Sequence, residues 1–145
     1  MNLEKAIEIA ISAHKGQVDK AGQPYVLHPL RVMRQMDADV EQIVAVLHDV
    51  VEDAPKDWTF KRLEDAGFGG DILAALRLLT KSDPHELYMD YIKRIRENSI
   101  ARKVKLADLQ DNMDLRRLSK VTDRDLARVR KYARAYNLLS ENCEP

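Results

Sequence analysis

The sequence has almost no cysteine: its 145 residues include one, Cys143. A lone cysteine cannot form an internal disulfide, which excludes a disulfide-stapled secreted scaffold and favours a reducing, cytoplasmic environment. No apolar run approaches the roughly 18 residues that a bilayer-spanning helix needs. The first residues enter an amphipathic, acidic pattern that is unlike a signal peptide. We therefore expect a cytoplasmic protein with no membrane partner.

The sequence also lacks an excess of charge of either sign, because 24 Lys and Arg residues balance 24 Asp and Glu residues. This balance gives no bulk attraction to nucleic acid or membrane, so an anionic ligand would need a local basic patch. With 45% hydrophobic and 33% charged residues, the composition is that of a globular protein. We expect one domain over residues 1–145, and the oligomeric state is left open.

Glycine is scarce, and the apolar spacing is helical nearly throughout. Helices are predicted from Leu3, from Pro29, and from about Val40 to Glu52 with Asp39 as the N-cap, with a loop over residues 16–24. Thr59 and Gly67 are expected to begin and end a short helix. Further helices are predicted over residues 71–79, 84–97, 100–113 and 123–139. No strand-like alternation persists, so the predicted fold class is all-α, a single helical bundle.

The most informative segment is residues 44–53, an apolar stretch that carries His48, Asp49, Glu52 and Asp53. Burying such groups costs several kcal/mol unless they are paired or bound to a metal. His48 and Asp49 lie about 100° apart on a helix, and Glu52 follows one turn later on the same side. The segment therefore predicts a shallow metal site with a carboxylate close enough to handle water.

Two further residues are candidate metal ligands: His28, at the entry to the second helix, and Asp108, within an apolar helix. Two imidazoles and two carboxylates suit Mn²⁺, Fe²⁺ or Zn²⁺ better than Ca²⁺, and on a six-coordinate ion they leave room for water and a phosphoryl oxygen. The spacing of these residues along the sequence does not show, however, that they lie close together in space. Each could instead be an ordinary core or surface residue, as we expect for His14 and His85.

The candidate residues lie in strings that resemble the metal-dependent phosphohydrolases of the HD superfamily. More narrowly, the chain resembles the hydrolase domain of RelA/SpoT-type alarmone enzymes, and above all the stand-alone small alarmone hydrolases. The resemblance covers roughly residues 3–140. The matching strings are Ala13-His-Lys-Gly-Gln17, Gly22-Gln-Pro-Tyr25, His28-Pro29, Leu47-His-Asp-Val-Val-Glu-Asp53, Thr80-Lys81, Lys105-Leu-Ala-Asp108 and Asn112-Met113.

This resemblance implies an HD-domain helical bundle that removes pyrophosphate from the 3′ position of a nucleotide such as ppGpp, an alarmone of the stringent response. The implied ligands of one divalent ion, typically Mn²⁺, are His28, His48, Asp49 and Asp108. Glu52 and Asp53 are implied as the acidic pair that activates water, a role that general acid–base chemistry permits. Asn112 matches the active-site asparagine that follows the last ligand.

Three residues are candidates for binding the nucleotide. Lys20 matches a basic substrate-binding position of the family. Arg128 and Tyr132 resemble a late helix whose arginine and tyrosine face the nucleotide, and residues four apart share one helix face. The alternative for each is a solvated cation or an aromatic residue of an amphipathic helix.

The chain departs from the long alarmone enzymes at Asp19, which replaces an arginine, and at Leu109 and Asp111, which replace an arginine and a histidine. These changes leave open whether the alarmone carries guanine or adenine, as in ppApp. The synthetase domain of the long enzymes is absent from this sequence. Two other functions remain: hydrolysis of another nucleotide, such as a 5′-nucleotide or NADPH, and non-catalytic nucleotide sensing. The presence of Glu52 and Asp53 favours an enzyme.

Overall fold

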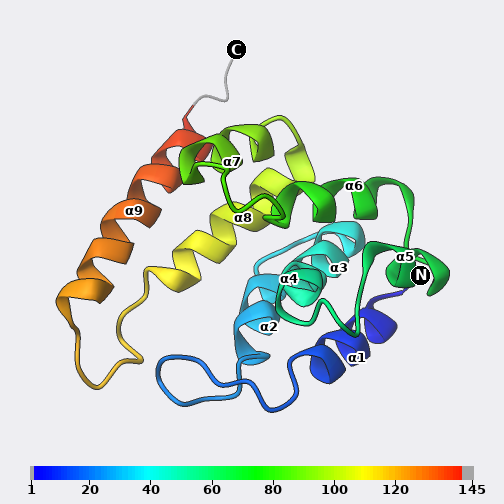
Figure 1. Ribbon diagram of the computed structural model, residues 1–145, viewed down its shortest axis with the longest axis horizontal. Helices are drawn as coiled ribbons and strands as arrows, with labels where there is room; N and C mark the ends of the chain where they lie inside the picture. Colours follow the sequence, from blue (N-terminus) through cyan, green and yellow to red (C-terminus); the bar gives the residue numbers. More distant parts are fainter. Residues whose placement is uncertain (1, 142–145) are drawn as a thin grey trace.

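Helix α3 (Asp39–Leu47) lies inside the molecule, and α9 (Asp123–Ser140) lies on the far side of α8 (Ser99–Asn112) from it (Figure 1). The computed structural model describes residues 2–141, so Cys143 lies outside the described residues. The remaining helices are α1 (Leu3–Ala13), α2 (Leu27–Arg34), α4 (Val50–Asp53), α5 (Phe60–Asp65), α6 (Gly70–Leu79) and α7 (Tyr88–Ile95).

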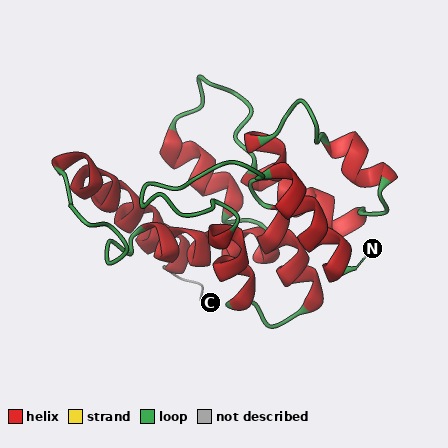
Figure 2. Cartoon of the chain, turned by 90° about the horizontal axis from the view of Figure 1, so that it is seen from below, coloured by secondary structure: helices red, strands yellow, loops and turns green. Residues whose placement is uncertain are grey.

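The all-α prediction is confirmed for residues 2–141, which contain helices, loops and one isolated backbone bridge between Val18 and Pro24 (Figure 2). None of the helices in this range combines the length and the apolar character needed to cross a bilayer. The predicted boundaries at Thr59 and Gly67 also hold. Thr59 is the N-cap of α5, and its side chain accepts a hydrogen bond from the backbone N–H of Arg62. Gly67 follows the end of the helix and has a φ of 102°.

The core explains the interior position of α3. All five residues from Ile43 to Leu47 are buried, because α3 packs against α1, α2, α6 and α8 together. Helix α8 in turn packs against α2, α3, α6 and α9. The C-terminal end of α3 and the second half of α8 therefore approach one another inside the molecule, where polar residues need partners.

The predicted helix over residues 40–52 is wrong in one respect, because it divides into α3 and α4 at His48 and Asp49. In an uninterrupted helix the carbonyl of Ala45 would accept the N–H of Asp49. Here that carbonyl accepts the Nδ1–H of the His48 ring at 2.6 Å and the His48 N–H at 3.4 Å. The imidazole thus competes with the backbone, and the helix is interrupted at the most polar point of the segment.

Three predicted helix starts are also corrected. The N-cap of α3 is Ala38, whose N–H is bonded by the Glu41 side chain, while Asp39 is the first helical residue. Helix α2 begins two residues before Pro29. Proline is tolerated in this first turn because the N–H groups there have no intrahelical acceptor, so the N–H that proline lacks is not missed. The helix predicted from residue 84 begins at Tyr88, because Asp83 holds the preceding residues in a turn.

Candidate metal centre and adjoining pocket

The structure brings together His28, His48, Asp49 and Asp108, which we refer to as the His–Asp cluster. One ligand atom each from His28, His48 and Asp49 lies within 4.8 Å of the other two. Asp108 Oδ1 completes the cluster, 2.8 Å from His28 Nε2 and 3.3 Å from His48 Nε2. Asp49 Oδ2 is 3.2 Å from His48 Nε2 and 3.8 Å from His28 Nε2. These separations suit ligands at right angles on one ion, which lie about 3 Å apart when each bond is about 2.1 Å.

Each imidazole is fixed by a contact at Nδ1, so that its Nε2 faces the centre of the cluster. His28 Nδ1 lies 2.7 Å from Asp111 Oδ2, and His48 Nδ1 donates to the Ala45 carbonyl. His48 Nε2 is buried and makes no hydrogen bond, although carboxylate oxygens of Asp49 and Asp108 lie 3.2 and 3.3 Å away. A buried nitrogen directed between two carboxylates is the arrangement expected of a metal ligand, so the residues present fit a divalent ion.

The two carboxylates of the cluster are also held in place. Asp49 Oδ2 accepts the hydroxyl of Tyr25 at 2.6 Å. Asp108 Oδ2 pairs with the Lys105 ammonium at 2.7 Å, and its Oδ1 accepts the Asn112 amide at 3.1 Å. The lysine therefore occupies one oxygen of Asp108 and leaves the other directed at the histidines.

Opposite charges inside the cluster compensate one another. Burial alone would lower the pKa of His28, but hydrogen bonds to Asp108 and Asp111 raise it to about 9. Burial likewise opposes charge on His48, yet the carboxylates of Asp49 and Asp108 hold its pKa well above its usual value. The pKa of each of these carboxylates is lowered despite burial, by His48 for Asp49 and by Lys105 and then His48 for Asp108. A divalent cation would displace protons from these histidines.

The acidic pair Glu52 and Asp53 lies in α4, directly after the cluster residue Asp49. Glu52 Oε1 accepts the backbone N–H of Lys81, which anchors one of its oxygens. Partial burial raises the pKa of Asp53 to about 7, and the charges of Asp49 and Glu52 add to this shift. Both side chains nevertheless reach solvent, so they can exchange protons with water.

His14 adjoins this pair and is more than the ordinary core residue that the sequence suggests. Its Nδ1 is 2.9 Å from Gln17 Oε1 and 3.9 Å from Asp53 Oδ2, and its ring lies against Tyr25. Its buried Nε2 has no partner. His85, by contrast, is exposed, which is one of the two ordinary placements, core or surface, that we expected for it.

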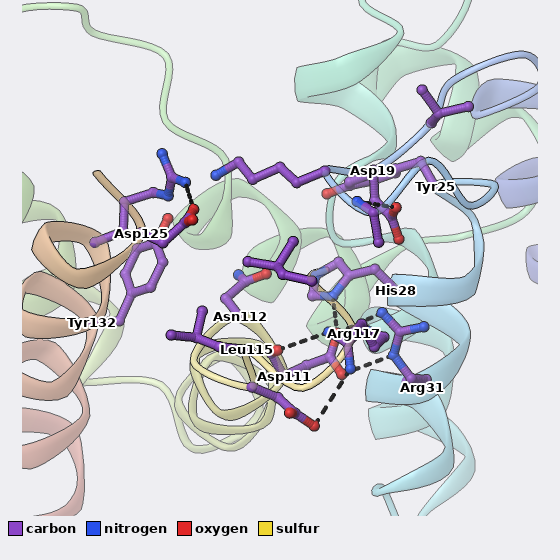
Figure 3. Close-up of a pocket in the computed structure, with 16 residues that line it drawn as sticks. Asp19, Tyr25, His28, Arg31, Asp111, Asn112, Leu115, Arg117, Asp125 and Tyr132 are labelled. Carbon is purple, nitrogen blue, oxygen red and sulfur yellow. Dashed lines mark hydrogen bonds and ion pairs between the residues drawn. The ribbon is translucent and has the colours of Figure 1, made fainter. Parts of the chain in front are cut away.

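A pocket of about 460 Å³ opens beside the cluster and contains all three residues predicted to bind a nucleotide, Lys20, Arg128 and Tyr132. Figure 3 shows Tyr132 on one side of this pocket and Asp19, Tyr25 and His28 on the other. Arg128 is paired with Asp125 of its own helix. The pKa of Lys20 is lowered by burial and by the charge of Arg128, which places the two cations near one another.

The structure places Leu109 and Asp111, the two departures from the long alarmone enzymes on α8, in different surroundings. Leu109 is fully buried in the core and does not line the pocket. Asp111 does line it, but Arg31 and Arg117 pair with its carboxylate, so it is not a free anion there. Asp19 accepts the N–H groups of Ala21 and Gln23 and so shapes its own loop.

Sequence reasoning gave no role to four side chains that hold the site together: Tyr25, Arg31, Lys105 and Arg117. Tyr25 and Lys105 lie in strings that resemble the alarmone enzymes, which was a usable signal. Arg31 and Arg117 carried none, because their partner Asp111 is 80 and 6 residues away in the sequence.

Comparison with known proteins adds an independent observation, although no protein-family model matches the chain. The guanosine-3′,5′-bis(diphosphate) 3′-pyrophosphohydrolase of Vibrio cholerae is 35% identical over 113 residues, which are 75% of this chain and 15% of that protein. The protein of the same name from Aquifex aeolicus is 31% identical over 122 residues, covering 77% of this chain and 17% of the relative. The chain thus spans less than a fifth of the length of these relatives. A solved structure described as a metazoan ortholog of SpoT that hydrolyses ppGpp matches with a TM-score of 0.73 and 26% identity, over 97% of this chain and 87% of that one.

Proposed function

Because the chain belongs to the HD-type hydrolase domains of the RelA/SpoT family, we propose that it is a metal-dependent 3′-pyrophosphohydrolase of nucleotide alarmones. The observation that carries this proposal is the His–Asp cluster, in which the buried His48 Nε2 faces two carboxylates but makes no hydrogen bond within residues 2–141, beside an acidic pair and a basic pocket. The substrate class follows that of the relatives, whose names specify a guanosine bis(diphosphate).

The ligands of one divalent ion would be His28 Nε2, His48 Nε2, Asp49 and Asp108, and Mn²⁺ suits this mixed nitrogen and oxygen set. When bound, the ion would lower the pKa of water and offset phosphate charge. Tyr25 and Lys105 each hold one carboxylate of the set, so that the four ligands do not have to reorganise on binding.

The acidic pair handles the protons of the reaction. A water oxygen attacks the phosphorus that carries the ribose 3′ oxygen, a new P–O bond forms, and the bond to the ribose oxygen breaks. Glu52 and Asp53 accept a proton from the water and return one to the departing oxygen. The products are pyrophosphate and a nucleotide with a free 3′ hydroxyl. Asn112, bonded to Asp108, lies between the cluster and the pocket and completes the catalytic set.

The pocket would hold the rest of the nucleotide. Its volume of about 460 Å³ lies in the range of small-molecule sites. Lys20 and Arg128 would bind phosphate oxygens, because charge-assisted hydrogen bonds are the strong ones, and Tyr132 would stack on the base. A cytoplasmic location fits such a substrate.

The test is a nucleotide panel with Mn²⁺, containing ppGpp, ppApp, a 5′-nucleotide and NADPH, with products identified by mass. Pyrophosphate release from ppGpp or ppApp supports the proposal and identifies the base. Release of orthophosphate alone contradicts it and favours another HD phosphohydrolase activity. Tight binding without turnover also contradicts it and favours a sensor. His48→Ala is the control, which should abolish both metal binding and turnover.

A further inference from the structure

Asp111, in the last turn of α8, is the most heavily bonded carboxylate next to the His–Asp cluster, although the proposed reaction does not use it. It is 8% exposed, and its Oδ2 lies 2.7 Å from His28 Nδ1. Arg31 donates a hydrogen bond to each carboxylate oxygen, with Nε 2.8 Å from Oδ1 and Nη2 3.0 Å from Oδ2. Arg117 lies on the other side, with Nη2 3.5 Å from Oδ2 and 3.1 Å from the Asp111 carbonyl oxygen.

The placement of these groups gives the carboxylate a fixed direction. Arg31 follows His28 by three residues on α2, so one face of that helix supplies both the imidazole and the guanidinium. A planar, two-point Arg–carboxylate pair leaves Asp111 little rotational freedom. The carboxylate thus ties α2 to α8, and the His28 ring is fixed between Asp111 at Nδ1 and Asp108 at Nε2.

We propose that Asp111, held by Arg31 and Arg117, is the positioning residue of His28. It keeps the proton on Nδ1, so that the Nε2 lone pair is directed into the cluster, and its negative charge makes that nitrogen a stronger donor to a cation. The other histidine is held differently, because His48 donates to a neutral backbone carbonyl. The two imidazoles of the cluster therefore differ in basicity, and the stronger donor depends on the Asp111 side chain.

This inference rests on the metal site of the proposed function, and Asp114 offers a matched control. Asp114 lines the same pocket three residues after Asp111 and is also bonded to arginine, at 2.9 and 2.8 Å from Arg116 and 3.5 Å from Arg117, but no hydrogen bond or ion pair joins it to a histidine within residues 2–141. Asp111→Ala and Asp114→Ala remove the same charge from the same region. Only Asp111→Ala removes the carboxylate that contacts His28 Nδ1.

The measurement is Mn²⁺ affinity, obtained by competition with a fluorescent chelator and without substrate. Loss of an outer carboxylate partner of a metal-bound histidine typically weakens binding by roughly 10- to 100-fold, which is the loss expected for Asp111→Ala. Asp111→Asn keeps an acceptor but loses the charge, so an intermediate loss is expected. Asp114→Ala should bind as the unmodified protein does. Equal losses at 111 and 114, or unchanged affinity in Asp111→Asn, would overturn the inference. The Asn variant decides the question if the Ala variant does not fold.

A second readout needs neither metal nor activity. In the metal-free protein the His28 Nδ1–H should give a downfield proton resonance protected from exchange by Asp111, assigned by its loss in His28→Gln. We expect that resonance to vanish in Asp111→Ala and to persist in Asp114→Ala. Its persistence in Asp111→Ala overturns the inference. Failure of the unmodified protein to bind Mn²⁺ would instead count against the proposed function, and this readout would still decide the role of Asp111.

Discussion

Replacing Lys105 by Met should destabilise the protein far more than replacing Lys103, two residues earlier on the same helix. The Lys105 ammonium lies 2.7 Å from Asp108 Oδ2, and the two side chains are 12% and 5% exposed. Despite its burial, the charge of Asp108 holds the pKa of Lys105 well above its usual value. Lys103 makes a similar contact to Glu41 at 2.9 Å, but its side chain is 41% exposed.

The magnitude follows from what each substitution leaves behind. Removing one partner of a buried pair costs about 3–5 kcal/mol, because the remaining charge is buried without compensation. Asp108 keeps its contacts with His28 and Asn112, so we expect the lower end, about 3 kcal/mol. Met keeps an unbranched apolar chain in place of the lysine stem, although it also removes the ammonium that lies 5.2 Å from the centroid of the Tyr91 ring. Ion pairs between solvent-exposed groups contribute little to stability, so only a small loss is expected for Lys103→Met.

Urea unfolding of the metal-free proteins, with a chelator present, measures both values. About 3 kcal/mol is a large part of the 5–15 kcal/mol that typically stabilises a domain, so the shift in midpoint would be plain. Equal losses of unfolding free energy in the two variants, or a Lys105→Met protein as stable as the parent, would show that the buried ion pair between Lys105 and Asp108 does not stabilise the protein as argued.

Three other predictions concern turnover, substrate binding and pH. Glu52→Ala should lower turnover by roughly 10² or more while sparing Mn²⁺ affinity, since it removes a positioned proton acceptor and no metal ligand; steady-state kinetics and chelator competition measure the two effects. Lys20→Ala and Arg128→Ala should each raise KM by roughly tenfold with little change in kcat, because a charge-assisted bond to phosphate is lost. Hydrogen bonds from a neighbouring arginine lower the pKa of Asp114, so its stabilising effect is complete above the unfolded value of about 4 and is lost as pH falls below it. Asp114→Asn should therefore flatten the acid limb of stability measured by urea unfolding, and an unchanged limb would show that the ion pair contributes nothing.

Much of the fold followed from local sequence signals. The caps at Thr59 and Gly67 and the spacing of apolar residues predicted elements within a few positions of the observed ones. The break at His48 could not be predicted in this way, because it depends on the imidazole reaching the Ala45 carbonyl in competition with a backbone N–H. That competition is decided by the tertiary burial of the ring rather than by propensity.

Some residues of the candidate site could likewise be predicted from the sequence, and others could not. The four cluster residues could be named because they lie in strings that resemble a known family. Their supports could not all be named, because the contact of Arg31 with Asp111 spans 80 positions and no short pattern marks it. Leu109 directly follows the cluster residue Asp108, yet its side chain is buried in the core and does not line the pocket, so nearness in the sequence does not place a side chain in the site.

In the proposed reaction, water attacks the phosphorus of a 3′-pyrophosphoryl group beside the His–Asp cluster. Turnover of the alarmone that the panel selects, in water enriched in oxygen-18 and with Mn²⁺ present, tests this most directly. We predict one labelled oxygen in the pyrophosphate and none in the nucleotide, with no turnover by His48→Ala. Label in the ribose 3′ hydroxyl, or label only in orthophosphate, would contradict the account.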